Sequence, residues 1–480
     1  MFKQLWATKL SQPSQDSAEG LSLQRVLGVW GLTALGIGAV IGGGIFVITG
    51  QAAANHAGPA IMLSFALAAI CCTFCALAYA EFAAMVPVSG SAYTYTYATF
   101  GELAAWFIGW MLVLEYGVSA AAVAVSWSGY FLSLLQHLGI HLSAALVNAP
   151  LDGTLHATGA IANLPAATIV LLLTWLCYFG IRKSSKINIA MVALKSGLIL
   201  LIIGVGWKYV NPDYWQPFIP TNQGPGKYGW NGVLHGASMV FFAYIGFEAV
   251  SVAAQESHRP QRDLPISMMS ALAICTVLYI MMAAVMTGLV PYTQLGTDEP
   301  VVTAVAAHPQ LGWLRVVVEI GALVGLSSVV LVMLIGQPRI FMIMAGDGLL
   351  PPIFSTIHSK HRTPHINTVI TGLGIALLAA VFPLDVLGEL TSMGTLIAFT
   401  AVCAGVLILR CTRPDLPRPF RMPAAWLFCS AGVLSCITLL SAMTRHNWIL
   451  MSVWTVLVFF PVLQLRISPQ QTASRKHLRQ

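Results

Sequence analysis

Two charged side chains lie deep within apolar segments of the sequence, where charge is costly. Lys195 lies in the run NIAMVALKSGLILLIIGVG and Glu115 in the run WMLVLEYGVSAAAV. A lysine at the centre of a bilayer costs about 2.5–3.5 kcal/mol on insertion scales, so Lys195 should have a role. It is either a structural lysine permanently paired with a carboxylate or a group that gains and loses a proton. Glu115 is either hydrogen-bonded to helix backbone or functional, as the transient partner of Lys195 or as an attractor for a cationic ligand.

Glycines are unusually dense in the apolar stretch GLTALGIGAVIGGGIFVITG, residues 31–50. Small residues in membrane helices usually allow two helices to approach closely. Three consecutive glycines, at residues 42–44, cover most of the circumference of a helix with 3.6 residues per turn, so packing alone does not explain them. Unpaired backbone at membrane depth is tolerated only where it lines a cavity or a site. We therefore predict that residues 38–46, beginning at Gly38, form an unwound hinge between two half-helices.

A second, weaker interruption is predicted in the sequence GVLHGASMVFFAYIGFEAVSVAAQE. Gly246 lies between the bulky residues Tyr244 and Phe247, and Glu248 follows within the apolar run. We expect Gly246 to be a hinge, and Glu248 either to hold that hinge or to contact a ligand. Phe242 is a packing residue by default, but beside an unwound helix it is the best candidate for a gate.

These residues require elements that cross a membrane. Of the 480 residues, 57% are hydrophobic and only 9% are charged, whereas about a quarter of the residues in soluble domains are charged. The chain is therefore predicted to be an all-α integral membrane protein. Apolar stretches of about 20 residues can span a bilayer, and the sequence contains twelve candidates: 29–53, 59–85, 103–135, 164–181, 187–209, 230–256, 266–290, 313–344, 365–383, 386–409, 424–443 and 448–465.

The basic residues predict the orientation of these spans. An even number of spans places both termini on one side, and 19 of the 24 Lys and Arg residues then fall on that same side. Because cytoplasmic loops collect Lys and Arg, both termini are predicted to be cytoplasmic. Nucleic-acid binding is disfavoured as an explanation of the net charge of +7, since the basic residues are spread over short loops.

Enzyme chemistry finds little support in the sequence. The twelve histidines show no HExxH motif or metal-spaced pairing, and no phosphate-binding P-loop is present. Cys72 and Cys75 lie one helical turn apart in an apolar run and form no repeat with metal-ligand spacing. We therefore expect no enzyme activity, no catalytic residues, no metal site, no cofactor and no direct use of ATP.

Four long motifs resemble one known family. They are GAVIGGGIF, YAEFAAMVPVSGSAYTYTYATFGELAAWFIGWMLVLEYGVSAAAVAVSWSGY, FFAYIGFEAVSVAAQESHRPQRDLPI and GQPRIFMIMAGDGLLPPIFSTIHSKHRTPHINT, and they extend from about residue 28 to residue 370. The chain is similar to the amino acid-polyamine-organocation superfamily and, within it, to the cationic amino acid transporter branch of bacterial permeases. The resemblance implies a five-plus-five inverted repeat with broken helices 1 and 6, followed by two extra helices.

The resemblance also implies a substrate held by the two unwound segments. Free N–H groups at the start of a half-helix favour an anion such as a carboxylate. We expect those groups in the segment formed by Ile41, Gly42, Gly43, Gly44 and Ile45. Freed carbonyl groups of Phe242, Ala243 and Ile245 are expected to accept hydrogen bonds from an ammonium group. Many relatives carry a larger residue at the position of Gly43, so a roomier pocket floor is expected there.

The resemblance further assigns the domains and the coupling ion. We expect a cytoplasmic N-terminal tail at residues 1–27, repeats at 28–210 and 211–411, two helices at 412–466 and a cytoplasmic C-terminal tail at 467–480. In proton-coupled relatives, a lysine in the fifth helix occupies the place where sodium-dependent relatives bind sodium. Lys195 is therefore expected to be the proton carrier.

Three functions remain open at this point. The first is a proton-coupled symporter that imports L-amino acids, with cationic ones as an option, across the bacterial cytoplasmic membrane by alternating access. The second is an amino acid exchanger of the same fold, and the third is a non-transporting amino acid sensor. The expected partners are the amino acid, protons and the lipid bilayer, without nucleic acid. The sequence identifies no helper peptide and no role for Glu319.

Overall fold

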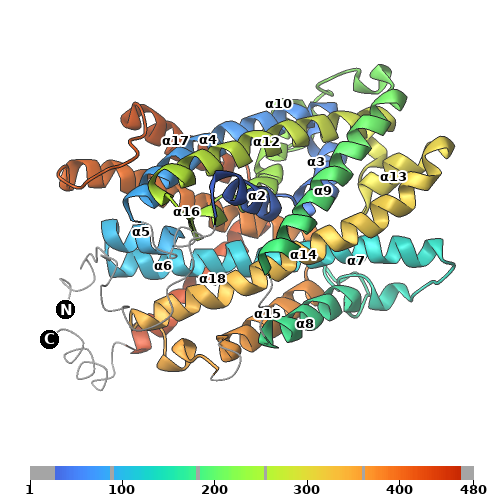
Figure 1. Cartoon of the computed structure of the whole chain (residues 1–480). Coiled ribbons are helices and arrows are strands. Elements are labelled where there is room, and N and C mark those ends of the chain that lie inside the picture. The colour runs from blue at the N-terminus through green and yellow to red at the C-terminus, as the bar shows by residue number, and fades with distance from the viewer. Residues whose placement is uncertain (1–26, 87–90, 180–183, 253–256, 359–362, 466–480) are drawn as a thin grey trace.

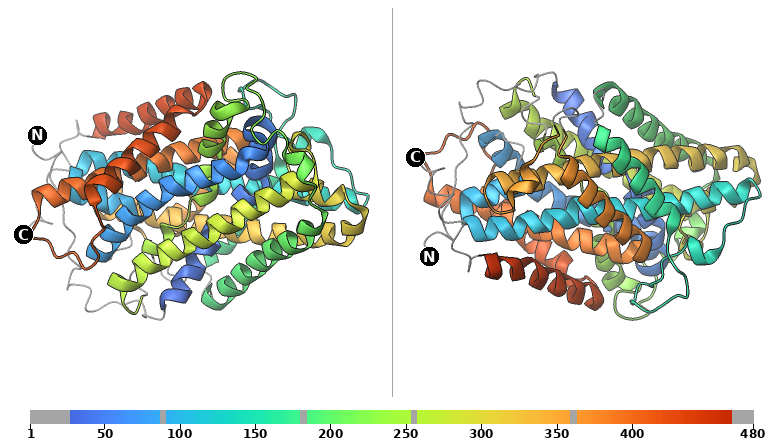
Figure 2. Two further views of the ribbon diagram at one scale, coloured as in Figure 1. Left: turned by 90° about the horizontal axis from the view of Figure 1, so that it is seen from above. Right: turned by 90° about the horizontal axis from the view of Figure 1, so that it is seen from below.

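The computed structural model describes residues 27–86, 91–179, 184–252, 257–358 and 363–465. In these ranges the chain consists of helices, turns and three isolated β-bridges. Figures 1 and 2 show that most of the helices run along the long axis of one bundle. The predicted all-α class is confirmed for these ranges. The tails predicted at 1–27 and 467–480 lie outside them, apart from Leu27.

Seven helical segments of the described chain are long and apolar enough to cross a membrane, or eight if the bent pair α17 (Ala425–Ser441) and α18 (Arg445–Leu465) forms one span. The seven are Gly44–Met85, Glu102–His137, Ala190–Tyr209, Gly229–Ser251, Pro260–Leu289, Pro309–Gly346 and Leu384–Thr412. Three further apolar helices have fewer than 18 residues: α2 (Val29–Val40), α8 (Leu164–Phe179) and α15 (His365–Val381). The count of twelve spans therefore stays a prediction.

Several helices that are far apart in the sequence pack on each other. Contacts join α4 (Ile61–Met85) to α12 (Pro260–Leu289), α7 (Ser119–His137) to α14 (Gly312–Gly346), and α8 to α15. Small residues permit this closeness, because a Cβ atom on Gly372 of α15 would overlap Thr174 of α8. α9 (Ser184–Gly206) packs against α2, α12 and α14, and this position places its Lys195 beside the end of α2.

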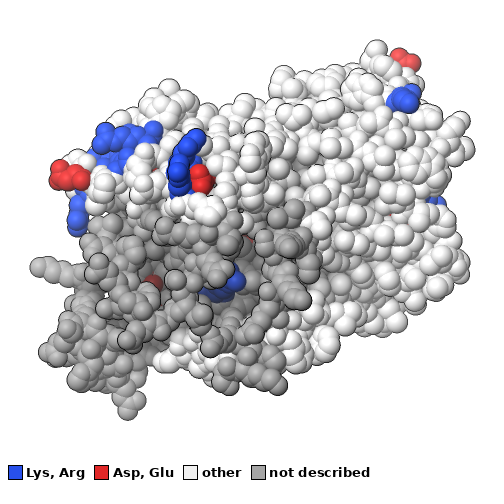
Figure 3. Space-filling model, in the orientation of Figure 1, with Lys and Arg blue, Asp and Glu red and all other residues white. Residues whose placement is uncertain are grey.

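The surface has the character expected for contact with lipid. Figure 3 shows one face on which Lys, Arg, Asp and Glu gather towards the two ends of the molecule and leave a broad uncharged middle. Large apolar side chains are exposed on α8 and α15, including Leu172, Trp175 and Leu377 at 57%, 64% and 65% exposure. An apolar surface of this kind is unfavourable in water, so these exposed side chains are consistent with contact with a lipid bilayer.

A buried ion-pair network fastens the end of α4 to α16 (Leu384–Thr412). Arg410 donates to both carboxylate oxygens of Glu81, at 3.0 and 2.5 Å, and Arg418 lies 3.6 Å from one of them. The backbone N–H of Met422 also donates to Glu81, at 2.9 Å. Glu81 is 2% exposed, so these partners take the place of the water that its buried carboxyl group has lost.

Candidate functional site

The first helix is interrupted at Ile41 and Gly42. The helix α2 ends at Val40, Ile41 is extended with φ −72° and ψ 101°, and a π-helical turn begins at Gly44 and leads into α3 (Thr49–Ala52). The interruption is shorter than the predicted 38–46. Gly38 lies inside α2, where a Cβ atom would overlap Val192 of α9, so this glycine allows close helix packing and does not belong to the unwound stretch.

The predicted span 230–256, the sixth of the twelve candidates, is also interrupted. The helix α10 (Gly229–Val240) continues as a 3-10 turn, Phe241–Tyr244, and the chain turns at residues 245–248 before α11 (Ala249–Val252). Gly246 has φ +121°, a backbone conformation that side-chain-bearing residues rarely adopt. A Cβ atom at Gly246 would also come within 2.8 Å of the carbonyl of Ala39. Glycine is therefore required here both by conformation and by contact with α2.

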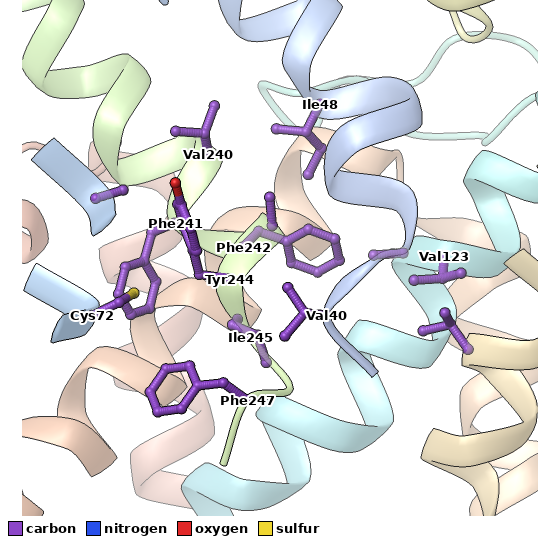
Figure 4. Packing of buried hydrophobic residues seen from close by; sticks show 14 of the residues in the cluster. Val40, Ile48, Cys72, Val123, Val240, Phe241, Phe242, Tyr244, Ile245 and Phe247 are labelled. Atoms are coloured by element: carbon purple, nitrogen blue, oxygen red, sulfur yellow. The ribbon is translucent and has the colours of Figure 1, made fainter. Parts of the chain in front are cut away.

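The two interruptions pack directly against each other. A Cβ atom on Gly44 would overlap Ala243, so the backbones of the two broken segments touch at this point. Figure 4 shows Phe242 and Ile245 on the side facing Val40 and the first interruption, whereas Phe241 and Phe247 lie on the opposite side, towards Cys72. Phe242 is 5% exposed and closes the space between the broken segments.

Backbone donors are free at the first interruption. The N–H groups of Gly42, Gly43 and Gly44 have no hydrogen-bond partner within the described residues, as the start of a helix requires. The space beside Gly43 is occupied by the hydroxyl of Ser126, only 2.9 Å from an ideal Cβ position, so the roomier floor expected there is not found. All three glycines are buried, which makes unpaired N–H groups costly in the absence of a ligand.

Backbone acceptors at the second interruption are only partly free. The carbonyl of Phe242 accepts from the N–H of Ile245 at 3.3 Å, and the carbonyl of Ala243 accepts from the hydroxyl of Tyr279 at 2.9 Å. The carbonyl of Ile245 has no partner within the described part of the chain. A carbonyl oxygen has two lone pairs, so all three can still accept a bond, but Ile245 is the acceptor that most needs one.

Lys195 caps the end of α2. Its ammonium group donates to the carbonyls of Gly38, at 2.7 Å, and Ile41, at 3.1 Å, and the side chain is 1% exposed. A cation is stabilised at the C-terminal end of a helix, where the last carbonyls lack intrahelical partners. No carboxylate forms an ion pair with Lys195 among the described residues, so the structure does not show a permanently paired lysine.

Glu115 and Glu248 form a separate carboxyl pair. Glu115 lies in a π-helical turn, Leu114–Val118, and its carboxyl group and that of Glu248 are buried close enough to influence each other electrostatically, although neither oxygen of Glu115 has a hydrogen-bond partner among the described residues. Such π-helical turns are frequent at functional sites. Glu248 accepts a hydrogen bond from the N–H of Gly246 at 3.0 Å and so braces the second interruption. The structure brings Glu115 to Glu248 and not to Lys195.

Two tyrosines that the sequence analysis did not single out connect the site. The hydroxyl of Tyr279 in α12 lies 2.9 Å from the carbonyls of both Val40 and Ala243, one from each interruption. The hydroxyl of Tyr130 donates to the carbonyl of Phe46 at 2.8 Å. Each is a single tyrosine in an apolar run, and the only signal in the sequence was a hydroxyl that needs a partner when buried.

A cavity of about 860 Å³ opens towards the end of the molecule that carries α13 (Pro300–Ala306). Its lining includes Gln51 and Met239, which precedes Phe242 by about one turn, and four carboxyl groups: Asp152, Asp298, Asp385 and Glu389. No Lys or Arg of the described ranges lies in this lining, so the carboxyl groups make its potential negative. Glu319 lies nearby in α14 and accepts from Ser133 at 2.8 Å and Arg315 at 3.0 Å, which gives it a structural environment that the sequence did not reveal.

Two interrupted membrane helices with free backbone groups at their meeting point define the architecture of a secondary transporter. A model of the amino acid permease family matches residues 27–462, and the chain belongs to this family. It is 46% identical to the branched-chain amino acid permease BcaP of Bacillus subtilis over 95% of this chain and 94% of that protein. It is 43% identical to the methylthioribose transporter of the same species, over 95% and 97%.

Transporters of eukaryotes are also similar. The vacuolar cationic amino acid transporter 2 of Arabidopsis thaliana is 39% identical over 83% of this chain and 62% of that protein. Membership of the amino acid-polyamine-organocation superfamily, implied by the motifs, is therefore confirmed. The chain is a multi-pass membrane protein of amino acid transport and not an enzyme.

Proposed function

We propose that the protein is a proton-coupled symporter that imports L-amino acids by alternating access. The observation that carries the proposal is the meeting of the two interruptions, with free N–H groups at Gly42–Gly44 and the ammonium group of Lys195 at the preceding helix end. The amino acid carboxylate binds the N–H groups of the segment from Ile41 to Ile45. Its ammonium group binds the carbonyl of Ile245, with those of Phe242 and Ala243 nearby.

Lys195 is the proton carrier in this proposal. A buried ammonium group that is held only by carbonyls, without a carboxylate, can release its proton more easily than one in an ion pair. Loss of that proton would weaken its hold on Gly38 and Ile41 and free the end of α2. Proton release and substrate binding are then coupled, because Lys195 holds the end of α2 at the same interruption that binds the substrate.

Phe242 and the second interruption form the gate. Phe242 lies between the two broken segments, and Glu248 braces Gly246, so rotation at Gly246 would move Phe242 relative to the first interruption. The acidic cavity at the α13 end is the outward vestibule, and both termini lie on the opposite, cytoplasmic side of a bacterial cytoplasmic membrane. The twelve spans and the inverted repeat of 28–210 and 211–411 belong to this proposal, supported by the pairing of corresponding helices.

The four carboxyl groups of the vestibule favour cationic amino acids as arriving substrates. The relatives named for branched-chain and cationic amino acids make both classes candidates, and Val40 and Phe242 offer apolar surface to a branched side chain. Because one relative is named for methylthioribose, this compound belongs in the same screen.

Purified protein in liposomes tests the proposal. Labelled leucine, isoleucine, lysine, arginine and methylthioribose are presented with an inward proton gradient to vesicles that contain no substrate. Accumulation that collapses with a protonophore supports symport. Uptake that requires preloaded amino acid and ignores the gradient identifies an exchanger, and binding without either process identifies a sensor.

A further inference from the structure

Four of the nine cysteines, from three segments that are far apart along the chain, converge at one point of the bundle. The sulfur of Cys436 lies 3.7 Å from that of Cys71 and 3.6 Å from that of Cys75, and the sulfur of Cys403 lies 3.9 Å from that of Cys75. All four side chains are buried, with at most 1% exposure. We refer to these four residues as the thiol cluster.

Three helices position the thiol cluster. Cys71 and Cys75 are four residues apart on α4 and therefore share one face of that helix. Cys403 belongs to α16 and Cys436 to α17, and the three helices pack on one another. The spacing of metal ligands is therefore absent from the linear sequence, which is why the sequence predicted no metal site, but it is assembled in the fold.

The sulfur–sulfur distances match those of a thiolate metal site. A tetrahedral ion with metal–sulfur bonds of about 2.3 Å separates its ligands by about 3.8 Å. The three observed distances, 3.6, 3.7 and 3.9 Å, surround this value. The sulfur atoms of Cys71, Cys75 and Cys436 all lie within 4.8 Å of one another, so one ion can reach all three.

Gly432 makes room for the fourth sulfur. It lies one turn before Cys436 on α17, and a Cβ atom at this position would come within 2.9 Å of the sulfur of Cys403. The absence of a side chain at this point lets α17 approach α16 closely enough to bring Cys403 to the cluster. The alternative is that the four thiols only fill space in the core, as small apolar groups do. In that case the thiol cluster would bind no ion.

We infer that Cys71, Cys75 and Cys436, with Cys403 as a fourth sulfur, form a binding site for a thiophilic divalent d10 cation such as Zn²⁺ or Cd²⁺. Thiolate sulfur is the ligand that such ions prefer. Each thiol that becomes a ligand loses its proton to solution when the ion binds, because the thiolate and not the thiol is the metal ligand. Three thiolates leave the complex with a single negative charge, fewer than four would, which favours Cys71, Cys75 and Cys436 as the ligands in these apolar surroundings. The ion would join α4 to α17.

Titration of the purified full chain with Cd²⁺ tests this inference. The exposed thiol of Cys411 is removed first, by Cys411→Ser, so that surface binding does not interfere. We expect one Cd²⁺ per chain, an ultraviolet thiolate-to-metal charge-transfer band and release of three protons to a pH indicator, one for each thiol of Cys71, Cys75 and Cys436. Cys436→Ser and Cys75→Ser should weaken binding by at least about tenfold, since even outer-shell partners of a metal contribute that much.

Cys177→Ser is the matched control, because this buried thiol lies on α8, outside the thiol cluster. It should leave Cd²⁺ affinity unchanged. X-ray absorption of the Cd²⁺-loaded Cys411→Ser protein needs no variant of the cluster, and should show three or four sulfur neighbours. Equal affinity in Cys436→Ser and Cys177→Ser, or a cadmium environment dominated by oxygen, would overturn the inference.

Discussion

Gly44 and Ala243 touch across the two helix interruptions, with no space for a side chain on Gly44. Gly44→Ala should therefore force the broken segments apart. Overpacking of this kind costs about 1–3 kcal/mol, and the misplaced N–H groups should lower the initial rate of substrate uptake by about tenfold or more. Uptake into liposomes, normalised to the amount of reconstituted protein, measures the effect.

Gly374→Ala is the matched control for this prediction. Gly374 lies on α15, outside the substrate-binding segments, and a Cβ atom there would meet no atom of the described chain within 4 Å. We expect near-normal uptake. Equal loss in both variants would show that the contact with Ala243 is not the reason for glycine at position 44.

Removal of the Lys195 side chain should uncouple transport from protons. Lys195→Ala leaves the carbonyls of Gly38 and Ile41 without their donor, and each unsatisfied buried group costs about 1–3 kcal/mol. We expect a lower thermal midpoint and loss of accumulation driven by an imposed pH gradient. Lys208→Ala, which removes an exposed lysine just after the same helix, should change neither. Accumulation by Lys195→Ala with unchanged pH dependence would contradict the carrier role.

Substitution of Glu115 should alter the pH dependence of uptake. Glu115→Gln keeps the size and polarity of the side chain but removes the carboxyl group that interacts with Glu248. If the two carboxyl groups exchange protons during transport, the pH at which uptake is half-maximal should move. The initial rate of uptake, measured between about pH 5 and pH 8, tests this. Histidine side chains also titrate in this range, so the variant is compared with the unchanged protein, in which they are the same. An unchanged profile would reject a protonation role for Glu115.

The ion-pair network of Glu81 should contribute to stability. Arg410→Met leaves the buried Glu81 carboxylate with Met422 and the more distant Arg418, and loss of one partner of a buried pair costs about 3–5 kcal/mol. We expect the lower end of that range, measured as a fall in the thermal midpoint. The double variant Glu81→Gln/Arg410→Met should recover part of the loss, whereas Arg413→Met, at an exposed position, should cause none. A double variant less stable than Arg410→Met would contradict this account.

Glu299 should make stability depend on pH at the α13 end. Burial and the neighbouring charge of Asp298 raise the pKa of Glu299 to about 7, against the opposing effect of Arg315. A carboxyl group with a raised pKa in the folded state stabilises below its unfolded pKa, and this contribution is lost as the pH rises through the folded value. The thermal midpoint should therefore fall between about pH 4.5 and pH 7, and Glu299→Gln should flatten this part of the profile. A slope of the same size in the variant would assign the effect to other groups.

The interruptions were predictable from the sequence, but their extents were not. Three consecutive glycines cannot all serve one packing face, and this excess predicted an interruption at residues 38–46, which includes the observed one at Ile41 and Gly42. Gly38 was predicted to begin this hinge, yet a Cβ atom there would meet Val192 in the neighbouring helix α9. Glycine for close packing and glycine for unwinding look alike until the neighbouring helix is known.

The partners of the buried charges could not be predicted. The position of Lys195 in an apolar run predicted a buried lysine. Its acceptors, however, are backbone carbonyls 157 and 154 residues away in the sequence. Every residue has a backbone carbonyl, so the sequence could not show which ones would be used. The same holds for Tyr279, whose hydroxyl connects Val40 and Ala243. Side-chain chemistry was visible in the sequence, whereas backbone groups became available only through the fold.

The cation at the end of α2 is covalently attached to the protein. A tethered group acts at an effective concentration set by its tether, not by its abundance in the medium. The ammonium group of Lys195 stays within 2.7–3.1 Å of its two carbonyls without drawing on any dissolved ion. The geometry of the first interruption should then be insensitive to the salinity of the surroundings, and sodium in place of potassium or choline should leave it undisturbed.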